Sequence, residues 1–484
     1  MIPLLSSIVF LPLLGAVMLL LIPSQMVKLI RTVSVLITGS VLILSLYLMM
    51  HFDTSRMMMQ FTEYHPWLSG LNIWYFVGVD GLSLGLVVLT ALLGLIACLA
   101  SMGIEQRVKE YFIFYLLLMT GMLGTFLALD LVLFYIFWEV VLIPMYFLIG
   151  IWGGPRREYA AVKFFLYTLA ASVLMLVAIL GVYFLSNPHT FNILELAYVG
   201  FAPHWQLILF CAFFLAFAVK VPVFPFHTWL PDAHVEAPTP ISVLLAGVLL
   251  KMGGYGIFRI CLPLFKHAAH ELAYIVGILG AINVFYGACV AFAQTDFKKM
   301  IAYSSVSHMG FVLLGAASLT ATGFNGAVLE MFNHGIITAG MFLLVGVLYD
   351  RAHTRELKLF GGLSSSMPIY AFCLTFLALA SLGLPGLGGF VGEFLSLAAV
   401  FGVFPWLGVI TVLGLVITVI YFLTMLGEVL LGAVNPKCSA YQEMNGRELW
   451  CVVPLMMIAL IVGFYPHSVL QFQEAVLLSL SRLF

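Results

Sequence analysis

Long apolar runs dominate this sequence and leave few folds open to it. Fourteen stretches are of the length, about 20 residues, that an α-helix needs to cross the hydrocarbon layer of a membrane. Hydrophobic residues make up 63% of the chain and charged residues only 8%, against roughly 25% charged residues in a globular protein. We therefore predict an all-α polytopic membrane protein with helices at residues 2–22, 30–50, 79–101, 111–129, 131–151, 160–185, 205–229, 239–262, 272–294, 300–319, 325–348, 366–402, 407–431 and 449–467.

The loops between these runs differ in charge. With the N-terminus outside the cell, fourteen lysines and arginines, including Lys298, fall in cytoplasmic loops, and four, including Arg259, fall on the other side. Such an excess of positive charge marks the cytoplasmic side of membrane proteins. We therefore expect a multi-pass membrane protein, in contact with lipid, with its N-terminus on the side opposite the cytoplasm. The net charge of −1 argues against nucleic acid as a partner.

Four charged residues lie deep inside the predicted spans, namely Glu139, Lys220, Lys251 and Glu393. Each charge at the centre of a membrane helix costs roughly 3 kcal/mol on insertion, so such residues pair with one another, face water or carry out a function. His308 and His334 add titratable groups to the tenth and eleventh spans. Two structural ion pairs are the alternative, but the series as a whole favours a proton relay.

Other polar residues near the spans are secondary candidates. Lys163 lies early in the sixth span, where its long side chain can reach the cytoplasmic surface or point inward. His227 and His234 lie near a membrane end, where we expect interfacial positions. Asp130 and Glu330 lie near span ends and are weaker candidates still.

The seven cysteines are scattered through apolar segments without a CxxC pair. Metal and iron–sulfur sites usually show such pairs at short spacing. We therefore expect buried thiols and no metal site in this chain.

Prolines and glycines interrupt two spans. Pro222 and Pro225 follow Lys220 in the seventh span, and the sequence Pro385-Gly386 precedes Glu393 in the twelfth. Proline removes a helical hydrogen bond, and in a membrane the freed backbone groups must be buried in protein or face water. We therefore predict that helices 7 and 12 are broken next to a charged residue.

The two predicted breaks are five spans apart, which is an odd number. Paired interrupted helices in two halves of a transporter point to an ion site between inverted repeats. We predict two inverted five-helix repeats, over residues 111–262 (helices 4–8) and 272–431 (helices 9–13). Residues 1–110 would form helices 1–3, and residues 432–484 a loop, helix 14 and the C-terminus.

A buried lysine beside a carboxylate has the chemistry of a proton switch. Burial disfavours the charged form of lysine, whereas a nearby carboxylate favours it. A lysine whose carboxylate partner moves closer or further away therefore takes up and releases a proton. We predict that Glu139 modulates Lys220 in this way, that Lys251 passes the proton on and that Glu393 releases it. Carbonyl groups freed by Pro222 would orient the water between them.

Five stretches closely resemble the antiporter-like membrane subunits of respiratory complex I. They are FWEVVLIPMYFLIGIWGG (137–154), AFAVKVPVFPFHTWLPDAHVEAPTP (216–240), LLKMGGYGIFRI (249–260), DFKKMIAYSSVSHMGFVLLG (296–315) and LPGLGGFVGEFL (384–395). The resemblance covers nearly the whole chain. Within this family the chain is most similar to the chain M group of bacterial NADH:quinone oxidoreductases, the mitochondrial subunit 4 type. Sister chains typically have lysine in place of Glu393.

The resemblance implies a fourteen-helix, proton-translocating subunit of the distal membrane arm, between related L-type and N-type chains. It implies that redox chemistry elsewhere in the complex drives translocation, with FMN, iron–sulfur clusters and quinone in partner subunits and no cofactor in this chain. By matching motif, it assigns the relay to Glu139, Lys220, Lys251, His308, His334 and Glu393. Glu330 departs from the family pattern, since an uncharged polar residue is expected one turn before His334.

Two other assignments share these motifs. One is a subunit of a multi-subunit cation/proton antiporter, and the other is the equivalent chain of a membrane-bound hydrogenase. The residue at Glu393 and the chain length favour the NADH:quinone oxidoreductase.

Overall fold

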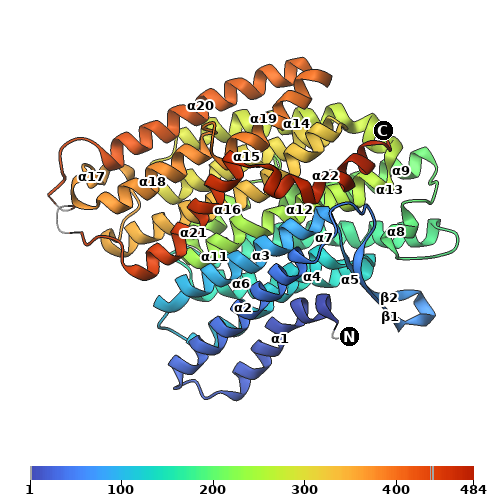
Figure 1. Ribbon diagram of the computed structural model, residues 1–484, viewed down its shortest axis with the longest axis horizontal. Coiled ribbons are helices and arrows are strands. Elements are labelled where there is room, and N and C mark those ends of the chain that lie inside the picture. Colours follow the sequence, from blue (N-terminus) through green and yellow to red (C-terminus); the bar gives the residue numbers. More distant parts are fainter. Residues whose placement is uncertain (1–2, 437, 439–440) are drawn as a thin grey trace.

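The structure is a computed structural model that describes residues 3–436, 438 and 441–484 (Figure 1). Among these residues, 13 helices are long and apolar enough to cross a membrane. Two shorter apolar helices, α18 (Pro368–Ser381) and α19 (Gly388–Val403), are the halves of the broken twelfth span. Both chain termini lie at one end of the bundle, as an even number of crossings requires. The predicted architecture of about fourteen spans is confirmed.

The first half of the chain builds the lower part of the bundle in Figure 1. Its helices up to the first break are α1 (Leu4–Leu21), α2 (Val27–Met50), α3 (Gly81–Ala100), α4 (Val108–Leu127), α5 (Leu131–Val140), α6 (Leu142–Trp152), α7 (Arg157–Leu185), α8 (Ile193–Leu196) and α9 (Pro203–Lys220). Helices α5 and α6 together form the predicted fifth span.

The eighth span is not a regular α-helix. It follows α10 (Trp229–Glu236) and runs through α11 (Thr239–Leu244), the π-helical turn η3 (Leu245–Leu249), α12 (Leu250–Gly256), the π-helical turn η4 (Ile257–Cys261) and α13 (Leu262–Leu264). Such π-helical turns are rare and occur mostly at functional sites. Lys251 lies between the two of them.

The second half of the chain covers the upper part of the bundle. Besides α18 and α19 it contains α14 (Lys266–Phe292), α15 (Phe297–Ala317), α16 (Ala321–Ala352), α17 (Leu363–Ser366), α20 (Pro405–Leu430), α21 (Gly446–Phe464) and α22 (His467–Ser481). Single 3₁₀ turns lie at η1 (Ser69–Leu71), η2 (Ser101–Gly103) and η5 (Leu357–Leu359).

A β-hairpin between α2 and α3 projects from the bundle (Figure 1). Strands β1 (Gln60–Leu68) and β2 (Ile73–Val79) pair antiparallel, and the rings of Tyr64 and Trp74 stack across them with centroids 4.5 Å apart. Cross-strand aromatic pairs of this kind stabilise hairpins. The hairpin was not predicted, because its two strands lie between the long apolar runs from which the membrane spans were predicted.

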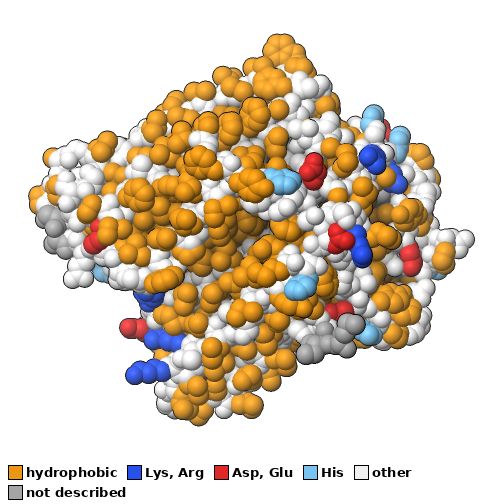
Figure 2. Space-filling view, in the orientation of Figure 1, with side chains coloured by type: hydrophobic (Ala, Val, Ile, Leu, Met, Phe, Trp, Pro, Cys, Tyr) orange, Lys and Arg blue, Asp and Glu red, His pale blue; other side chains and the backbone are white. Residues whose placement is uncertain are grey.

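Burial separates inner helices from outer ones. In the most apolar window of each span, 100% of the residues are buried in Thr239–Leu264 and 94% in both α15 and α16, against 28% in α2 and 39% in α20. The outward face of the bundle is mostly hydrophobic (Figure 2). The helices that carry Lys251, His308 and His334 are therefore enclosed by other helices, and the outer helices present the apolar surface that lipid requires.

Some expectations about position are wrong. Lys298, expected in a cytoplasmic loop, lies within α15 and is 4% exposed, and Arg259, counted on the other side of the membrane, lies within η4 and is 7% exposed. Cys211 is exposed on α9, although buried thiols were expected. The boundaries of apolar runs do not reveal the neighbouring helices, and those neighbours decide whether an end residue is enclosed.

Candidate functional site

The first broken helix ends next to a buried lysine. Helix α9 ends at Lys220, and α10 begins only at Trp229. Asn283 of α14 bridges this break, since its Oδ1 accepts from the amide of Phe224 at 2.8 Å and its Nδ2 donates to the carbonyl of Pro222 at 3.0 Å. One carbonyl that was expected to orient water therefore already has a protein partner, and Asn283 satisfies the backbone as membrane burial demands.

Lys220 lies over an aromatic ring. Lys220 is only 3% exposed, and its Nζ lies 4.0 Å from the centroid of the Trp138 ring on α5. A cation over an indole face is attracted by the ring quadrupole. Glu139, the next residue on α5, interacts electrostatically with Lys220, and its Oε1 is buried without a hydrogen-bond partner. Among the described residues, no hydrogen bond or ion pair joins the two side chains directly.

Lys251 and His334 are in direct contact. The Lys251 side chain is fully buried, and its Nζ donates to the carbonyl of Ala246 and lies 2.6 Å from Nδ1 of His334. When Lys251 carries its proton, its ammonium group has only donors, so Nδ1 of a neutral His334 then accepts from it and the ring proton lies on Nε2. That Nε2 is buried and has no hydrogen-bond partner.

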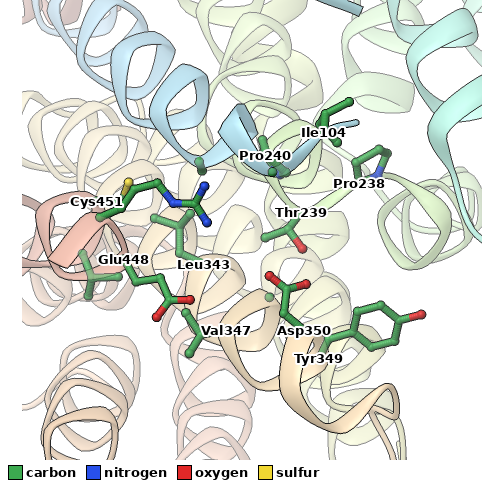
Figure 3. A pocket seen from close by; sticks show the side chains of 15 residues that line it. Ile104, Pro238, Thr239, Pro240, Leu343, Val347, Tyr349, Asp350, Glu448 and Cys451 are labelled. Carbon is green, nitrogen blue, oxygen red and sulfur yellow. The ribbon is translucent and has the colours of Figure 1, made fainter. Parts of the chain in front are cut away.

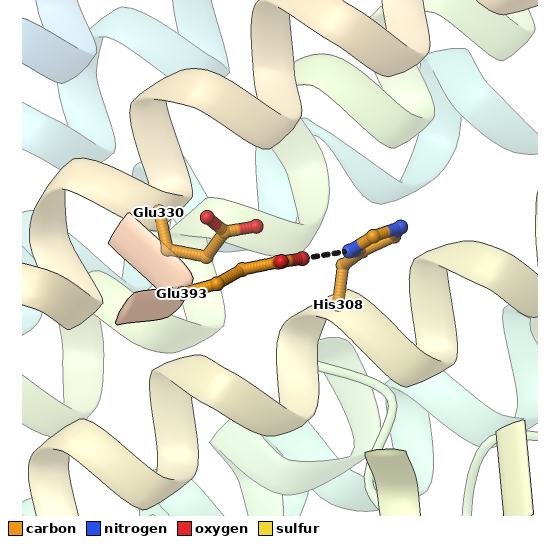
Figure 4. A group of neighbouring side chains, drawn as sticks. All are labelled: His308, Glu330 and Glu393. Carbon is orange, nitrogen blue, oxygen red and sulfur yellow. Dashed lines mark hydrogen bonds and ion pairs between the residues drawn. The ribbon is translucent and has the colours of Figure 1, made fainter. Parts of the chain in front are cut away.

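His308 continues this series toward the second broken helix. Its ring centroid lies 5.7 Å from that of His334. Its Nδ1 lies 2.8 Å from Oε1 of Glu393 on α19 (Figure 4). Its Nε2 lies 3.2 Å from Oγ of Ser381 on α18. Lys251, His334, His308 and Glu393 thus follow one another from the eighth span to the twelfth.

Glu330 belongs to the same cluster. It is 2% exposed on α16, and its Oε2 has no hydrogen-bond partner among the residues that the structure describes. Possible ligand atoms of His308, Glu330 and Glu393 all lie within 4.8 Å of one another (Figure 4). A Cβ on Gly392 would lie only 2.7 Å from Oε2 of Glu330, so this glycine lets the carboxylate approach α19. Glu330, expected near a span end, is the tenth of the 32 residues of α16 and is enclosed there by its neighbours.

A small cavity connects these groups. It has a volume of about 10 Å³ and is lined by His308, Glu330, His334 and Glu393, among others. This volume is at the lower limit for one water molecule. The lining offers several donors and acceptors for such a molecule.

The secondary candidates lie mainly inside the protein. Nζ of Lys163 forms an ion pair with Asp232 of α10 at 2.7 Å. His227 is 2% exposed and His234 is fully buried, and neither ring of the two makes a hydrogen bond. His234 stacks on Phe342 with centroids 4.6 Å apart. The expected interfacial position of both histidines is wrong, because the break after α9 places α10 inside the bundle.

Asp130 has a structural role at the start of α5. Its carboxylate accepts from the backbone amides of Val132, Leu133 and Trp74. Burial raises the pKa of Asp130 to about 6. A carboxylate in this position satisfies amides at a helix N-terminus, and it links α5 to the β-hairpin.

The buried ion pair between Arg259 and Asp80 was not predicted from the sequence. Nη2 of Arg259 lies 2.5 Å from Oδ1 of Asp80, which also caps the start of α3. Asp80 with Ser83 three residues later forms a capping box, which is a readable sequence signal. No such signal predicts that Asp80 pairs with Arg259, because the two residues are 179 positions apart in the sequence.

A larger cavity opens at the end of α16. It has a volume of about 250 Å³, and its lining includes Asp350, Glu448 and Pro238 (Figure 3). Pro238 directly follows Ala237, whose carbonyl accepts from buried Lys298 at 2.5 Å. The charges of Lys298 and Lys251 both act on His234. The cavity therefore reaches close to the buried titratable groups.

Comparison with known proteins assigns the fold and the family. The family described as "NADH:quinone oxidoreductase/Mrp antiporter, TM" matches residues 128–418. The chain belongs to this family. It is 43% identical over 477 residues to "NADH-quinone oxidoreductase subunit M" of Rickettsia bellii, a match that covers 97% of this chain and 96% of that protein. All six residues of the predicted relay lie inside the matched range.

Solved structures of the family show the same architecture. A chain of respiratory complex I from Thermus thermophilus matches with a TM-score of 0.91 and 32% identity, over 99% of both chains. A chain of the Mrp complex from Dietzia sp. matches with a TM-score of 0.88 over 99% of this chain and 97% of that one, but at 21% identity it shows the fold alone. The chain is thus a multi-span membrane protein similar to subunit M of complex I.

Proposed function

We propose that this chain translocates protons as a membrane-arm subunit of an NADH:quinone oxidoreductase. The observation that supports this most is a pair of contacts, Lys251 with His334 and His308 with Glu393, whose two imidazole rings have centroids 5.7 Å apart, a gap that one water molecule would bridge. Groups that exchange protons at hydrogen-bond distance are what a relay needs. Ionisable residues at this depth mark proton pathways in pumps and transporters.

Each residue of the relay has a distinct task. Lys220 stores the proton, and Glu139 modulates its affinity through their electrostatic interaction. Since Glu139 makes no direct contact with Lys220, a small shift of α5 changes this interaction without breaking a hydrogen bond. Lys251 and His334 pass the proton on, and Glu393 releases it with help from Glu330. Among the described residues, no hydrogen bond joins Lys220 to Lys251, so water bridges them.

Proton uptake is assigned to the larger cavity at the end of α16. Its lining includes Pro238, which directly follows Ala237, the residue whose carbonyl accepts a hydrogen bond from Lys298. The charge of Lys298 in turn acts on His234. From His234 the proton reaches the pair of Lys251 and His334. Under the predicted orientation, this end of α16 faces the cytoplasm.

The driving reaction lies outside this chain. Redox chemistry at FMN, iron–sulfur clusters and quinone of partner subunits supplies the energy. The partners in the membrane arm are the related L-type and N-type chains, with lipid against exposed outer helices such as α2 and α20. The protein resides in the bacterial inner membrane with its N-terminus in the periplasm.

The test is proton translocation by the purified complex in liposomes, measured per NADH oxidised, with Lys220→Ala. A positioned proton-transfer group contributes about 10²-fold or more, so translocation should fall by that factor while the complex still assembles. Lys28→Ala, on the exposed start of α2, is the matched control and should pump normally. A fully active Lys220→Ala complex overturns the proposal, and NADH-independent sodium exchange would favour the antiporter.

A further inference from the structure

We propose that His308, Glu330, His334 and Glu393 form a binding site for one Zn²⁺ ion, at which zinc blocks proton translocation. The proposal goes beyond the relay, and its inhibitory part rests on the proposed function. Sequence spacing predicted no metal site because the four ligands come from three helices, α15, α16 and α19, and have no short motif.

The geometry places several possible ligands around one small space. One ligand atom each of His308, Glu330 and Glu393 lies within 4.8 Å of the others. His334 lines the same cavity, which has a volume of about 10 Å³. An ion about 2.0–2.2 Å from each nitrogen and oxygen requires these atoms to draw together slightly and the ring of His334 to approach them.

Two of these residues have an unsatisfied buried atom. Oε2 of Glu330 and Nε2 of His334 are buried and have no hydrogen-bond partner, and both residues are only 2% exposed. A buried polar group without a partner is costly. Both residues line one cavity, and a single bound cation would satisfy both atoms once the ring proton of His334 has moved from Nε2 to Nδ1.

The contacts of the two histidines leave one nitrogen of each for a metal. Nδ1 of His334 is taken by Lys251, which leaves Nε2. Nε2 of His308 lies 3.2 Å from Oγ of Ser381, so Nδ1, which contacts Glu393, becomes available to the metal when the ring proton moves to Nε2 and is donated to that hydroxyl. Histidine ligands commonly hold their second nitrogen in a hydrogen bond, which fixes the orientation of the ring. Zinc binding at Nε2 releases one proton from this pair to water: Lys251 becomes neutral and accepts from Nδ1–H of His334, and Nε2 then carries the lone pair for the metal.

The ligand types select the metal. Two imidazole nitrogens and two carboxylate oxygens make a set that suits tetrahedral Zn²⁺. Mg²⁺ and Ca²⁺ prefer oxygen ligands alone, so they should not compete. The double charge of Zn²⁺ also neutralises Glu330 and Glu393, which otherwise lie buried near one another. Zinc at this position occupies the atoms of His334, His308 and Glu393 that pass the proton, so transfer between them stops.

The first experiment measures zinc binding and zinc inhibition on the intact purified complex. The complex is stripped of metal with a chelator and titrated with Zn²⁺, and bound zinc and NADH-driven proton translocation are followed together. Each variant is compared with its own rate without metal. Glu330→Gln should lose one bound zinc per complex and should need at least about tenfold more zinc for half inhibition, as loss of metal-site contacts typically does. Mg²⁺ at the same concentration should have no effect.

Glu271→Gln is the matched control. Glu271 lies 3.4 Å from His267 in an exposed pair on α14, which is a plausible surface site for zinc. This variant should keep both the buried zinc and the inhibition. The proposal is overturned if Glu330→Gln keeps wild-type zinc content and sensitivity, or if Glu271→Gln abolishes the inhibition.

A second measurement needs no variant. X-ray absorption at the zinc edge on the wild-type complex, loaded with one equivalent of Zn²⁺, should show two imidazole nitrogens and two oxygens. A shell with sulfur or with oxygen alone overturns the proposal. Bound zinc is measured independently of pumping, so an active Lys220→Ala complex would refute the proposed function and leave the zinc content to decide on the metal site.

Discussion

The two broken helices hold their charged residues in different ways. At the first break, Lys220 lies over the ring of Trp138, and no hydrogen bond among the described residues joins it to Glu139. At the second break, Glu393 lies 2.8 Å from Nδ1 of His308 and close to Glu330. Lys220 can therefore change its electrostatic interaction with Glu139 without breaking a hydrogen bond between them, whereas Glu393 is held by His308 and lies close to Glu330.

The backbone at both breaks is held in the same way, by an asparagine of a neighbouring helix. Asn283 bridges Pro222 and Phe224 at the first break, and Nδ2 of Asn333 donates to the carbonyl of Gly388 at 2.6 Å at the second. Breaks in a membrane helix need such partners because lipid offers none. The difference between the breaks therefore lies in their charges and not in their backbone.

The largest effect is expected at the second break. His308→Leu removes the donor to Glu393 and leaves two buried carboxylates without it, and removing one partner of a buried pair costs about 3–5 kcal/mol. The measurement is the thermal denaturation midpoint of the purified complex. His204→Leu, on the exposed start of α9, is the control and should have little effect. Equal midpoints for the two variants would mean that Glu393 is not held by His308.

A smaller loss of stability is expected when the first break loses its asparagine. Asn283→Ala leaves the amide of Phe224 and the carbonyl of Pro222 without this partner, and an unsatisfied buried group costs about 1–3 kcal/mol. Asn333→Ala removes one hydrogen bond and should cost about 1 kcal/mol. The same thermal measurement compares them. A larger loss for Asn333→Ala than for Asn283→Ala would contradict this ranking.

Glu139→Gln should separate stability from activity. Because no direct hydrogen bond or ion pair is lost, the free energy of unfolding should change by less than about 1 kcal/mol. Translocation should fall by about tenfold, which corresponds to roughly 1.4 kcal/mol. Proton translocation and thermal denaturation are measured on the same preparation, with the exposed Glu158→Gln as control. A loss of stability as large as that of His308→Leu would show a locked ion pair at the first break.

The smallest effect is expected at the ring beneath Lys220. Trp138→Phe keeps an aromatic face for the ammonium group and should cost less than about 1 kcal/mol, whereas Trp138→Leu removes the face and should cost about 1–2 kcal/mol. Translocation by both variants and their thermal midpoints are compared. Identical behaviour of the two variants would exclude a contribution of the aromatic ring to holding Lys220.

Much of the fold is predictable because membrane burial acts locally on the chain. Lipid offers no hydrogen bonds, so every crossing must be a long apolar helix, and its length and breaks can be read from the sequence. Prolines after Lys220 and the Pro385-Gly386 pair therefore marked both breaks. Charges such as Lys251 stood out for the same reason, since an apolar run has no other place for them.

The inverted relation of residues 111–262 and 272–431, and the domain boundaries drawn from it, stay predictions. They were inferred from two breaks and a few charges. The structure contains both breaks at the expected positions.

The sequence by itself determined the number of crossings, the two breaks and the identity of the deeply placed charges, because each depends on the composition of one short stretch. Only the tertiary structure decided which of these charges meet. His308, Glu330 and Glu393 come from three helices, and Asp80 and Arg259 are 179 residues apart. Contacts over such separations depend on how the helices pack, which no local pattern records, so the enclosed position of His234 and the place of Glu330 in the cluster emerged only from the fold.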